Sequence, residues 1–477
     1  MTKVFLVNPL VQINNKERIH FLRDYAGGEI PTSMVYPPLD LAYTAALLRE
    51  HGVSVSLLDA STLDIAVPEL VKTAVKEDPD FIGIPSAWGS IQYDMDLSRY
   101  FKNALPDAKI IIWGPNVTAG PETALSCGHI DYVILGEPEK PFLDIVNGMF
   151  TENIAYQTCG KLVQTKRTLL QDLDSLPFPA RDLLPNKRYI APYARENPFT
   201  TISTSRGCPY SKCIFCPTNI WYMNQVRYRS VGNVMEEIDE IVYKYGIRSL
   251  VFRDQSLTFE RERLFNICEE IIRRDYPLSW RCFAGVGGIN MELLSIMKRA
   301  GCYQVNYGFE SGSQQVLDSN NKGVTLKESI DAVRFTKAAG MEVSGSFMLG
   351  MFGDNESTIK NTVDFAIKLD LDYAEFLVAT PLPSTKFYEL SGLPEDANAS
   401  LTQRWYNRSY SSNSLLSAGF LDKQIKRAYR RFYFRPAYIF KRSCRVSSPR
   451  QLIAQLKSAA SLFTTTISRP CVGAANS

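Results

Sequence analysis

Short apolar runs alternate with amphipathic stretches throughout residues 1–150. The apolar runs are rich in β-branched residues and show no polar alternation, which is typical of strands buried on both faces of a parallel sheet. Between them, apolar positions recur at helical spacing, as in LDLAYTAALLREHG (39–52), which ends in a glycine stop signal. Strands that alternate with helices predict an α/β domain with a doubly wound, Rossmann-like sheet. The runs are KVFLV (3–7), VSVSLL (53–58), DFIGI (80–84), AKIIIW (108–113) and DYVIL (131–135).

The ends of these predicted strands carry small and polar residues. Sheets of this type bind ligands outside the carboxyl ends of their strands, where glycine lets a ligand approach the backbone closely. Taken singly, each glycine could equally be an ordinary turn residue. Together the strand ends predict a ligand site formed by Ser86, Gly114, Asn116, Gly136 and Glu137.

Residues 151–197 are predicted to link two domains. Within them, DLDSLPFPARDLLP (172–185) carries three prolines and shows neither a helical nor a strand period. Proline disfavours helical conformation in the residue before it, so we expect this stretch to be an extended strap.

The alternation of strand and helix resumes in residues 198–390. Six strand–helix units in succession predict a partial, TIM-like (β/α)6 barrel, whose chemistry is expected at the carboxyl ends of its strands. The predicted strands are FTTISTS (199–205), SLVFRD (249–254), WRCFAGV (280–286), QVNYGFE (304–310), EVSGSFML (342–349) and YAEFLVAT (373–380).

Residues 391–463 are predicted to be helical and strongly basic, and residues 464–477 to be a disordered tail. Between Lys423 and Lys457 there are eleven Lys or Arg residues and no Asp or Glu, with aromatic residues interleaved. One interpretation is a solvated helical cap over the barrel. The other is a cationic amphipathic segment that contacts an anionic membrane surface, with a lipid as the substrate.

The composition is that of a globular protein. Its 477 residues are enough for two or three domains, with the usual balance of 45% hydrophobic and 22% charged residues. A net charge of +3 and the lack of a recognition motif argue against nucleic acid as a partner. The apolar run VFLV (4–7) is too short for a signal peptide, and no run reaches the ~18 apolar residues of a membrane span. We therefore expect a cytoplasmic protein with reduced thiols.

Three of the ten cysteines are close together, in RGCPYSKCIFCPT (206–218). Cys208, Cys213 and Cys216 fall in the loop after the first predicted barrel strand. A disulfide would leave one thiol over, and zinc would need a fourth ligand from a second short pair that the sequence lacks. We favour a [4Fe–4S] cluster, because three thiolates would leave one iron open for a substrate or cosubstrate. The other seven cysteines are isolated, and we expect them to pack as small hydrophobic residues.

Residues 200–390 resemble the radical S-adenosylmethionine (radical SAM) superfamily. The three cysteines match its cluster motif, with four residues instead of three between the first two. Phe215 matches the aromatic residue before the third cysteine, and Glu310, in YGFESGS, matches a polar contact to S-adenosylmethionine. Asp254, in FRDQSLT, stands where the family more often has an acidic pair. The resemblance implies that a [4Fe–4S] cluster cleaves S-adenosylmethionine to a 5′-deoxyadenosyl radical, with electrons from a donor such as flavodoxin or ferredoxin.

Residues 1–150 resemble the cobalamin-binding domain of the B12-dependent branch of that family. YPPLDLAYTAALLREHG (36–52) matches the opening of the domain, and the later strand ends match in order. Many cobalamin domains carry an Asp-x-His-x-x-Gly loop whose histidine binds cobalt, but no histidine follows Asp59 here, and Asn116 replaces another frequent histidine. The resemblance implies cobalamin bound without a protein histidine at the predicted ligand site. The alternative is a degenerate domain that binds nothing.

The resemblance further implies an enzyme that uses all three cofactors. We expect a methyltransferase that methylates an unactivated carbon of a small-molecule or lipid substrate through methylcobalamin. One alternative is an oxidative cyclase or rearrangement enzyme with the same cofactors. Another is a non-catalytic cobalamin-binding protein, which would have no use for an open iron. The sequence assigns no catalytic side chain and does not identify the substrate.

Overall fold

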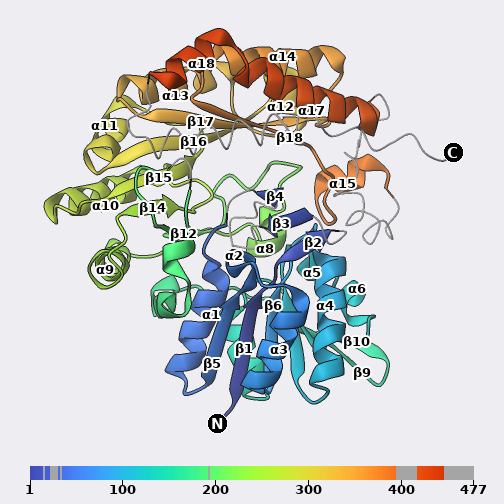
Figure 1. Ribbon diagram of the computed structural model, residues 1–477. Coiled ribbons are helices and arrows are strands. Elements are labelled where there is room, and N and C mark those ends of the chain that lie inside the picture. Colours follow the sequence, from blue (N-terminus) through green and yellow to red (C-terminus); the bar gives the residue numbers. More distant parts are fainter. Residues whose placement is uncertain (14–16, 22–30, 33–34, 192–193, 394–415, 445–477) are drawn as a thin grey trace.

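Two α/β units, each built around a largely parallel sheet, make up the computed structural model of the chain (Figure 1). The structure describes all residues except 14–16, 22–30, 33–34, 192–193, 394–415 and 445–477. The predicted tail, 464–477, therefore lies outside the described residues. Within the part of the chain that is described, no helix is both long and apolar enough to cross a membrane.

The first sheet has seven strands in the order β10-β9-β8-β7-β6-β1-β5. The five predicted strands are parallel neighbours, as expected for a doubly wound sheet. β9 and β10 form an antiparallel hairpin at one edge, so the sheet extends into the stretch predicted as a linker. Cys159 and Gly160 make its turn with positive φ angles of 50° and 73°. The strands are β1 (Lys3–Asn8), β5 (Ser54–Asp59), β6 (Phe81–Pro85), β7 (Lys109–Trp113), β8 (Tyr132–Ile134), β9 (Ile154–Thr158) and β10 (Lys161–Gln164).

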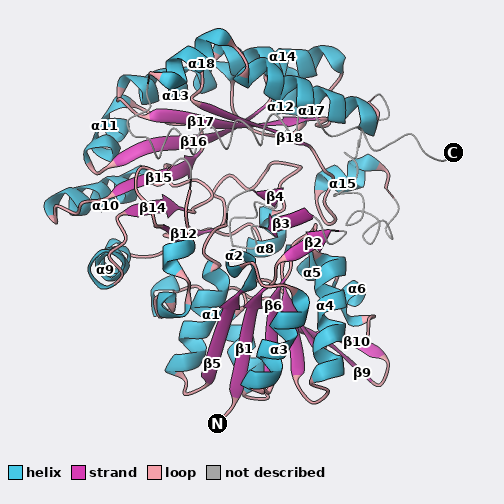
Figure 2. Ribbon diagram, in the orientation of Figure 1, coloured by secondary structure: helices cyan, strands magenta, loops and turns pink. Residues whose placement is uncertain are grey.

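Helices cover both faces of this sheet (Figure 2). In β1, which lies between β6 and β5, Val4 and Leu6 enter one core while Phe5 and Val7 enter the other. Because successive side chains of a strand point to opposite faces, a strand buried on both faces has no polar alternation. The helices are α1 (Leu39–Glu50), α2 (Ala60–Leu63), α3 (Val67–Glu77), α4 (Ile91–Ala104), α5 (Pro115–Ala119), α6 (Pro121–Leu125) and α7 (Glu139–Val146).

A small antiparallel sheet, which the sequence did not predict, follows β1 directly. It consists of β2 (Val11–Ile13), β3 (Glu17–Phe21) and β4 (Pro31–Thr32). Since it continues from the carboxyl end of β1, it begins at the edge of the first sheet where ligands are expected. Figure 1 shows this small sheet at the level between the two units.

The second unit is an open barrel of six parallel strands in chain order, β11-β14-β15-β16-β17-β18. The predicted (β/α)6 fold is therefore confirmed. Its strands are β11 (Phe199–Ile202), β14 (Ser249–Phe252), β15 (Ser279–Ala284), β16 (Cys302–Glu310), β17 (Glu342–Leu349) and β18 (Tyr373–Val378). Its helices are α9 (Val231–Asp239), which continues as a π-helical turn (Glu240–Lys244), α10 (Arg261–Arg273), α11 (Met291–Arg299), α12 (Gln314–Ser319), α13 (Leu326–Ala338), α14 (Glu356–Lys368) and α15 (Lys386–Ser391).

The proline-containing strap between the units has only short 3-10 turns, at Leu173–Ser175, Arg181–Leu183 and Asn186–Arg188. Of the isolated cysteines, Cys268, Cys282 and Cys302 are buried in the barrel core, as predicted. Cys159 and Cys444 are exposed, which corrects the prediction for these two. Cys159 is exposed because it lies in the hairpin turn. Cys444 directly follows the last described helix, and Cys471 lies outside the described residues.

The described part of the basic C-terminal region packs as a cap on the barrel. α17 (Ala418–Tyr433) lies against β18 and α14, and α18 (Pro436–Ser443) reaches β18 through Arg442, which donates to the Tyr373 hydroxyl. The Tyr433 hydroxyl accepts a hydrogen bond from the Ala374 amide (3.0 Å) and donates to the carbonyl of the same residue (2.8 Å). These bonds satisfy backbone groups at the open edge of the barrel, which would otherwise be an unpaired strand edge.

Ion pairs to barrel carboxylates neutralise three of the cations in this cap. Arg431 pairs with Asp364 (2.6 Å), Lys441 with Asp370 (2.6 Å) and Arg442 with Glu342 (3.2 Å).

Candidate functional site

The cysteine loop lies at the carboxyl end of the first barrel strand. It is enclosed by a short hairpin of β12 (Ser205–Arg206) and β13 (Arg227–Tyr228), and contains the short helix α8 (Thr218–Tyr222). Its three cysteines line one cavity of about 960 Å³ at the mouth of the barrel. The same cavity is lined by Phe215, Asp254 and Glu310. All six barrel residues predicted from the sequence are therefore brought together.

The cysteine loop is docked on the turn that follows α12. The Ile214 amide donates to the Asn320 carbonyl (3.2 Å), and the Tyr210 hydroxyl donates to the Asn321 carbonyl (2.9 Å). Tyr210 packs so closely on Gly323 that a Cβ there would lie 2.1 Å from its hydroxyl. Ser211 has a φ of 47°, so the longer spacing between the first two cysteines contains a left-handed turn. The extra residue lengthens the loop and leaves all three thiols at the cavity.

Burial raises the pKa of two of the thiols, Cys213 and Cys216. It raises the pKa of Cys213 to about 12, against the lowering effect of the nearby Lys322 ammonium. Burial also raises the pKa of Cys216, whose sulfur lies 2.9 Å from the Thr218 hydroxyl oxygen. A metal must displace these protons, because the thiolate is the ligand.

The donor set fits a cluster. Across the described ranges, no group of three or more His, Cys, Asp or Glu residues is arranged to hold a single metal ion. A [4Fe–4S] cluster does not need three donors around one metal ion, because each thiolate binds a different iron. Three half-buried thiols on one short loop at the wall of a large cavity therefore fit a cluster with one open iron.

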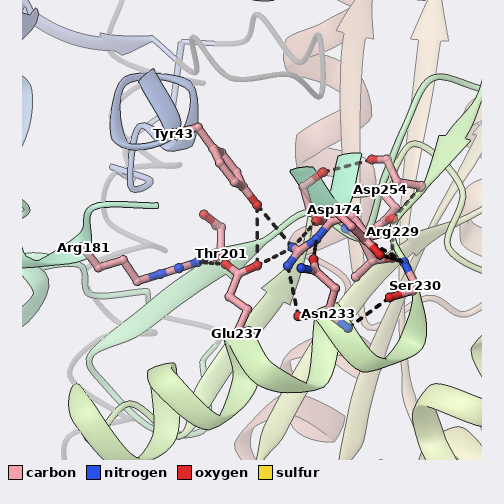
Figure 3. Close-up of polar contacts among 12 residues, drawn as sticks. Tyr43, Asp174, Arg181, Thr201, Arg229, Ser230, Asn233, Glu237 and Asp254 are labelled. Carbon is pink, nitrogen blue, oxygen red and sulfur yellow. Dashed lines mark hydrogen bonds and ion pairs between the residues drawn. The ribbon is translucent and has the colours of Figure 1, made fainter. Parts of the chain in front are cut away.

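Asp254 supports the chain that leads into the cysteine loop. Its carboxylate accepts hydrogen bonds from the Thr204 hydroxyl (2.7 Å) and amide (3.2 Å) and from the Ser205 hydroxyl (2.5 Å). Asp254 is labelled in Figure 3, where dashed lines mark its hydrogen bonds. The side chain lines the cavity but is already occupied by these bonds. Its contact to a cofactor stays a prediction.

Glu310 ends β16 with a φ of 62° and pairs with Lys322, a residue that sequence reasoning missed. The Lys322 ammonium lies 2.8 Å from Glu310 Oε1. Burial lowers the pKa of Lys322, but the Glu310 carboxylate and the neighbouring thiols outweigh it, so the net shift is upward. Lys322 is therefore a cation fixed at the wall of the cavity beside the cysteine loop. The turn NNKG gave no chemical signal, because its contact to Glu310 depends on the fold.

The ligand edge of the first sheet is a connected hydrogen-bond system. The Asn116 amide donates to the Ser86 hydroxyl (3.0 Å) and to the Ala87 carbonyl (2.8 Å). Gly114 has a φ of 148°, and a Cβ there would lie 2.0 Å from the Ser86 carbonyl oxygen. Gly136 donates its amide to the Thr118 hydroxyl (2.9 Å). Ser86, Gly114, Asn116 and Gly136 therefore line up along this edge, as predicted.

This edge fits a bound group. Asn116 Oδ1 is buried and has no hydrogen-bond partner among the described residues. A buried polar atom without a partner costs free energy unless a ligand or water supplies one. Asn116 therefore has an unused acceptor on the edge where the cobalamin resemblance predicts a contact.

The described histidine side chains lie away from that edge. His51 and His129 precede β5 and β8, at the amino ends of these strands. His51 is exposed, with Nδ1 2.9 Å from the Leu47 carbonyl. Asp59, at the carboxyl end of β5, accepts hydrogen bonds from the Tyr189 hydroxyl (2.8 Å) and the Asn8 amide (2.9 Å). The Thr62 hydroxyl (2.5 Å) and amide (3.1 Å) of α2 also donate to it, so the partners of the Asp59 carboxylate come from β1, α2 and Tyr189 ahead of the barrel.

Glu137 differs from the other predicted edge residues, because its carboxylate is held by arginines of the second unit. Glu137 Oε1 and Oε2 lie 2.7 and 2.8 Å from two nitrogens of Arg227, and Arg206 lies 3.2 Å from Oε1. Burial raises the pKa of Glu137, but the two guanidinium groups lower it by more than burial raises it. The net pKa of Glu137 is therefore below the usual range. Sequence reasoning had no signal for these partners.

A second buried network joins the units beside this one (Figure 3). Arg229 is ion-paired with Glu237 and donates to the Tyr43 hydroxyl (3.2 Å), which comes from α1 of the first unit. Arg181 of the strap reaches the other oxygen of Glu237 at 2.6 Å. Burial raises the pKa of Tyr43 to about 12. The two units are thus joined by charged groups withdrawn from water.

Two family models match the chain, one in each unit. The Radical SAM superfamily model matches residues 202–366, and the B12 binding domain model matches residues 31–146. The chain is 33% identical over 418 residues to an uncharacterised methyltransferase of Pyrococcus horikoshii, covering 85% of this chain and 89% of that protein. It is 26% identical over 443 residues to the anaerobic magnesium-protoporphyrin IX monomethyl ester cyclase of Rubrivivax gelatinosus, covering 88% of this chain and 78% of that one.

Among solved structures, the fold is similar to that of OxsB, a cobalamin-dependent S-adenosylmethionine radical enzyme with aqua-cobalamin and S-adenosylmethionine bound. The TM-score is 0.71 at 17% identity, over 98% of this chain and 72% of that chain. The barrel with its cysteine loop and the first sheet with its ligand edge define a radical SAM enzyme. The chain belongs to the cobalamin-binding, B12-dependent radical SAM family. Its cofactors are a [4Fe–4S] cluster, S-adenosylmethionine and cobalamin.

Proposed function

We propose that the protein is a cobalamin-dependent methyltransferase that acts on an unactivated carbon of a small molecule. The observation that carries this proposal is the pairing of the cysteine-lined barrel cavity with the ligand edge of the first sheet. The relative of Pyrococcus horikoshii, matched over most of both chains, bears the name of a methyltransferase. We further propose that the protein works in the cytoplasm, with electrons from flavodoxin or ferredoxin.

In this proposal each predicted residue of the barrel has one task. Cys208, Cys213 and Cys216 hold the cluster, and Phe215 lies against the adenine of S-adenosylmethionine. Glu310, held by Lys322, orients the cosubstrate, and Asp254 fixes the chain that carries the cysteine loop.

On the ligand edge, Ser86, Gly114, Asn116 and Gly136 contact cobalamin without a histidine ligand to cobalt. When bound, the cofactors supply the radical chemistry and the methyl group, while the protein orients them and excludes water.

Anaerobic turnover with S-adenosylmethionine that carries a deuterated methyl group tests the proposal. Candidate substrates are taken from extracts of cells that lack the enzyme. We expect formation of 5′-deoxyadenosine and a product heavier by one deuterated methyl group. Release of 5′-deoxyadenosine with no labelled product would contradict methyl transfer.

The second candidate is ring formation or another oxidation with the same cofactors. It is supported by the match to the cyclase of Rubrivivax gelatinosus, which spans 88% of this chain. Its signature in the same assay is an unlabelled product that has lost hydrogen.

Contact with an anionic membrane, and with it a lipid substrate, is a separate proposal. It is supported by α18, where Ile439 and Phe440 are 50% and 73% exposed next to Lys441 and Arg442, whose ion pairs to Asp370 and Glu342 lie on the barrel side. Exposed apolar side chains beside cations are typical of helices that lie in a membrane interface.

A further inference from the structure

The neck of the cysteine loop is narrow and carries two arginines. β12 and β13 pair for only two residues, which places Arg206 opposite Arg227. Residues 207–226, with all three cysteines, lie between them. Gly207 has a φ of 102°, and a Cβ there would lie 2.0 Å from the Gln225 carbonyl oxygen. The position of the cysteine loop is therefore set where its two ends meet.

Carboxylates of the first unit hold both arginines. Glu137 makes two parallel bonds to Arg227, at 2.7 and 2.8 Å, while Arg206 lies 2.6 Å from Glu139 and 3.2 Å from Glu137. All four side chains are at most 7% exposed. Two carboxylates and two guanidinium groups balance in charge, and bidentate pairs of this kind are directional as well as strong.

Glu137 lies in the connection between β8 and α7, which also carries part of the ligand edge, and Glu139 is the first residue of α7. Glu137 directly follows Gly136, whose amide is held by Thr118 at that edge. Arg167, which lies 3.3 Å from where a Gly136 Cβ would be, donates to the Ile220 carbonyl inside the cysteine loop (2.7 Å). One short connection thus touches the cobalamin edge on one side and the neck of the cysteine loop on the other.

We propose that Glu137 and Glu139 are positioning residues that couple cobalamin binding to the placement of the cysteine loop. The inference rests on the proposed function, in which one cofactor system generates a radical and another delivers a methyl group to it. Such a reaction requires the two to be held at a fixed separation. A ligand that orders the connection after β8 also orders the neck, because both involve the same residues.

The coupling is reciprocal, so binding of the cluster equally favours the connection that cobalamin needs.

Hydrogen–deuterium exchange on the full chain, loaded with its cluster and compared with and without hydroxocobalamin, tests the coupling. In the wild type we expect cobalamin to slow exchange in residues 207–226 by about tenfold, a typical size for coupling between sites. Glu137→Gln keeps the shape but removes the charge. This variant is expected to bind cobalamin, as measured by the visible spectrum of the bound cofactor. Its exchange in residues 207–226 is expected to be the same with and without cobalamin. Arg227→Gln and the double variant Glu137→Gln/Arg227→Gln are both expected to match Glu137→Gln, since all three break the same pair.

Asp182→Asn is the matched control, because it breaks an exposed contact between α1 and the strap. Arg49 and Asp182 lie 2.7 Å apart with side chains 45% and 44% exposed, and their loss is expected to leave the response unchanged. If Glu137→Gln does not fold, Glu139→Gln serves instead and leaves the Glu137–Arg227 pair intact.

A loop that responds fully in the glutamine variants, or not at all in the wild type, would overturn the proposal. Loss of cobalamin itself from Glu137→Gln would also overturn it, because Glu137 would then be a cobalamin contact. If the wild type makes no methylated product but its loop responds, the methyltransferase assignment fails while the coupling stands.

Discussion

At the scale of single residues, the cysteine trio is the most direct test of the site. We predict that Cys213→Ala prevents reconstitution of the cluster, because two thiolates cannot replace the three that a cluster with one open iron requires. Cys268→Ala is the matched control, since Cys268 is buried in the barrel core away from the cavity. Iron and sulfide content and the visible spectrum after anaerobic reconstitution measure the result. A full complement of iron and sulfide in Cys213→Ala would refute the assignment.

Glu310 is predicted to act on S-adenosylmethionine and not on the cluster. Glu310→Ala removes the anion that Lys322 faces at 2.8 Å, and the loss of a hydrogen bond to a charged group weakens binding by about tenfold or more. The cluster content is expected to stay normal. Equilibrium titration with S-adenosylmethionine measures the affinity, with Glu328→Gln, an exposed capping residue of α13, as the control. An unchanged dissociation constant in Glu310→Ala would count against the role.

The sequence could predict those residues whose chemistry is local. The cysteine spacing and the segment around Glu310 are continuous in the chain, so their pattern is visible without a fold. Lys322 and the arginine partners of Glu137 were missed because their contacts join segments that are distant in the sequence. Charged residues of this kind have the same composition on a surface as in a buried pair. Only the fold distinguishes the two.

At the scale of elements, the ligand edge of the first sheet predicts cobalamin binding without histidine. Protein loaded with hydroxocobalamin in the absence of oxygen is expected to retain about one cobalamin per chain, as for a single site at such an edge. His51→Ala and His129→Ala are expected to keep it, because both residues lie at amino ends of strands. His20, in β3, follows the carboxyl end of β1, so His20→Ala is the most stringent variant.

Loss of cobalamin, or a changed cobalt spectrum, in any of the three variants would contradict binding without histidine. Failure of the wild type to retain cobalamin would remove the methyl carrier and leave a radical enzyme alone.

The last two described helices allow a decision between a cap and a membrane contact. α17 packs on the barrel edge, while α18 exposes Ile439 and Phe440. If α18 meets a membrane, the protein is expected to float with anionic but not neutral liposomes, and less so at high salt because the charges are screened. Ile439→Ser/Phe440→Ser is expected to reduce flotation. No flotation of the intact protein with anionic liposomes at low salt would leave the region a cap and remove the support for a lipid substrate.

At the scale of the whole molecule, both units and their order could be predicted, because strand and helix periods are local properties of the chain. Besides the small sheet of β2, β3 and β4, two features could not. The β9–β10 hairpin is too short and too polar to stand out from a linker, and it forms because β8 offers an edge to pair with. The orientation of the units is fixed by pairs such as Glu137–Arg227, for which the sequence carries no periodic signal.

The buried network around Glu237, which Tyr43 of the first unit joins through its hydroxyl, is predicted to weaken in acid. Burial raises the pKa of Glu237, but Arg229 and Arg181 lower it more, so its folded pKa lies below the ordinary 4.5. Its stabilising effect is therefore complete above that ordinary value and is lost as the pH falls through the folded pKa. Glu237→Gln is expected to lower the thermal midpoint at neutral pH, since breaking a buried pair costs about 3–5 kcal/mol.

The difference in thermal midpoint between wild type and Glu237→Gln should shrink as the pH falls. Thermal unfolding at a series of pH values from neutral to below pH ~4 measures it. A difference that stays constant with pH would contradict the assigned pair. The comparison with the variant is needed because burial raises the pKa of Asp59 and Asp354, which favours the folded state in acid.

The two-residue ladder of β12 and β13 has a consequence for assembly. Because backbone bonds of the protein itself join the two ends, residues 207–226 form a closed ring whose closure uses no cluster ligand. Closing a free segment of that length costs roughly 3 kcal/mol of chain entropy by the logarithmic scaling of loop closure. Folding of the two units meets that cost in advance, so iron and sulfide need only order the inside of a ring. A cluster lost to oxygen should then be rebuilt repeatedly from iron and sulfide while both units stay folded.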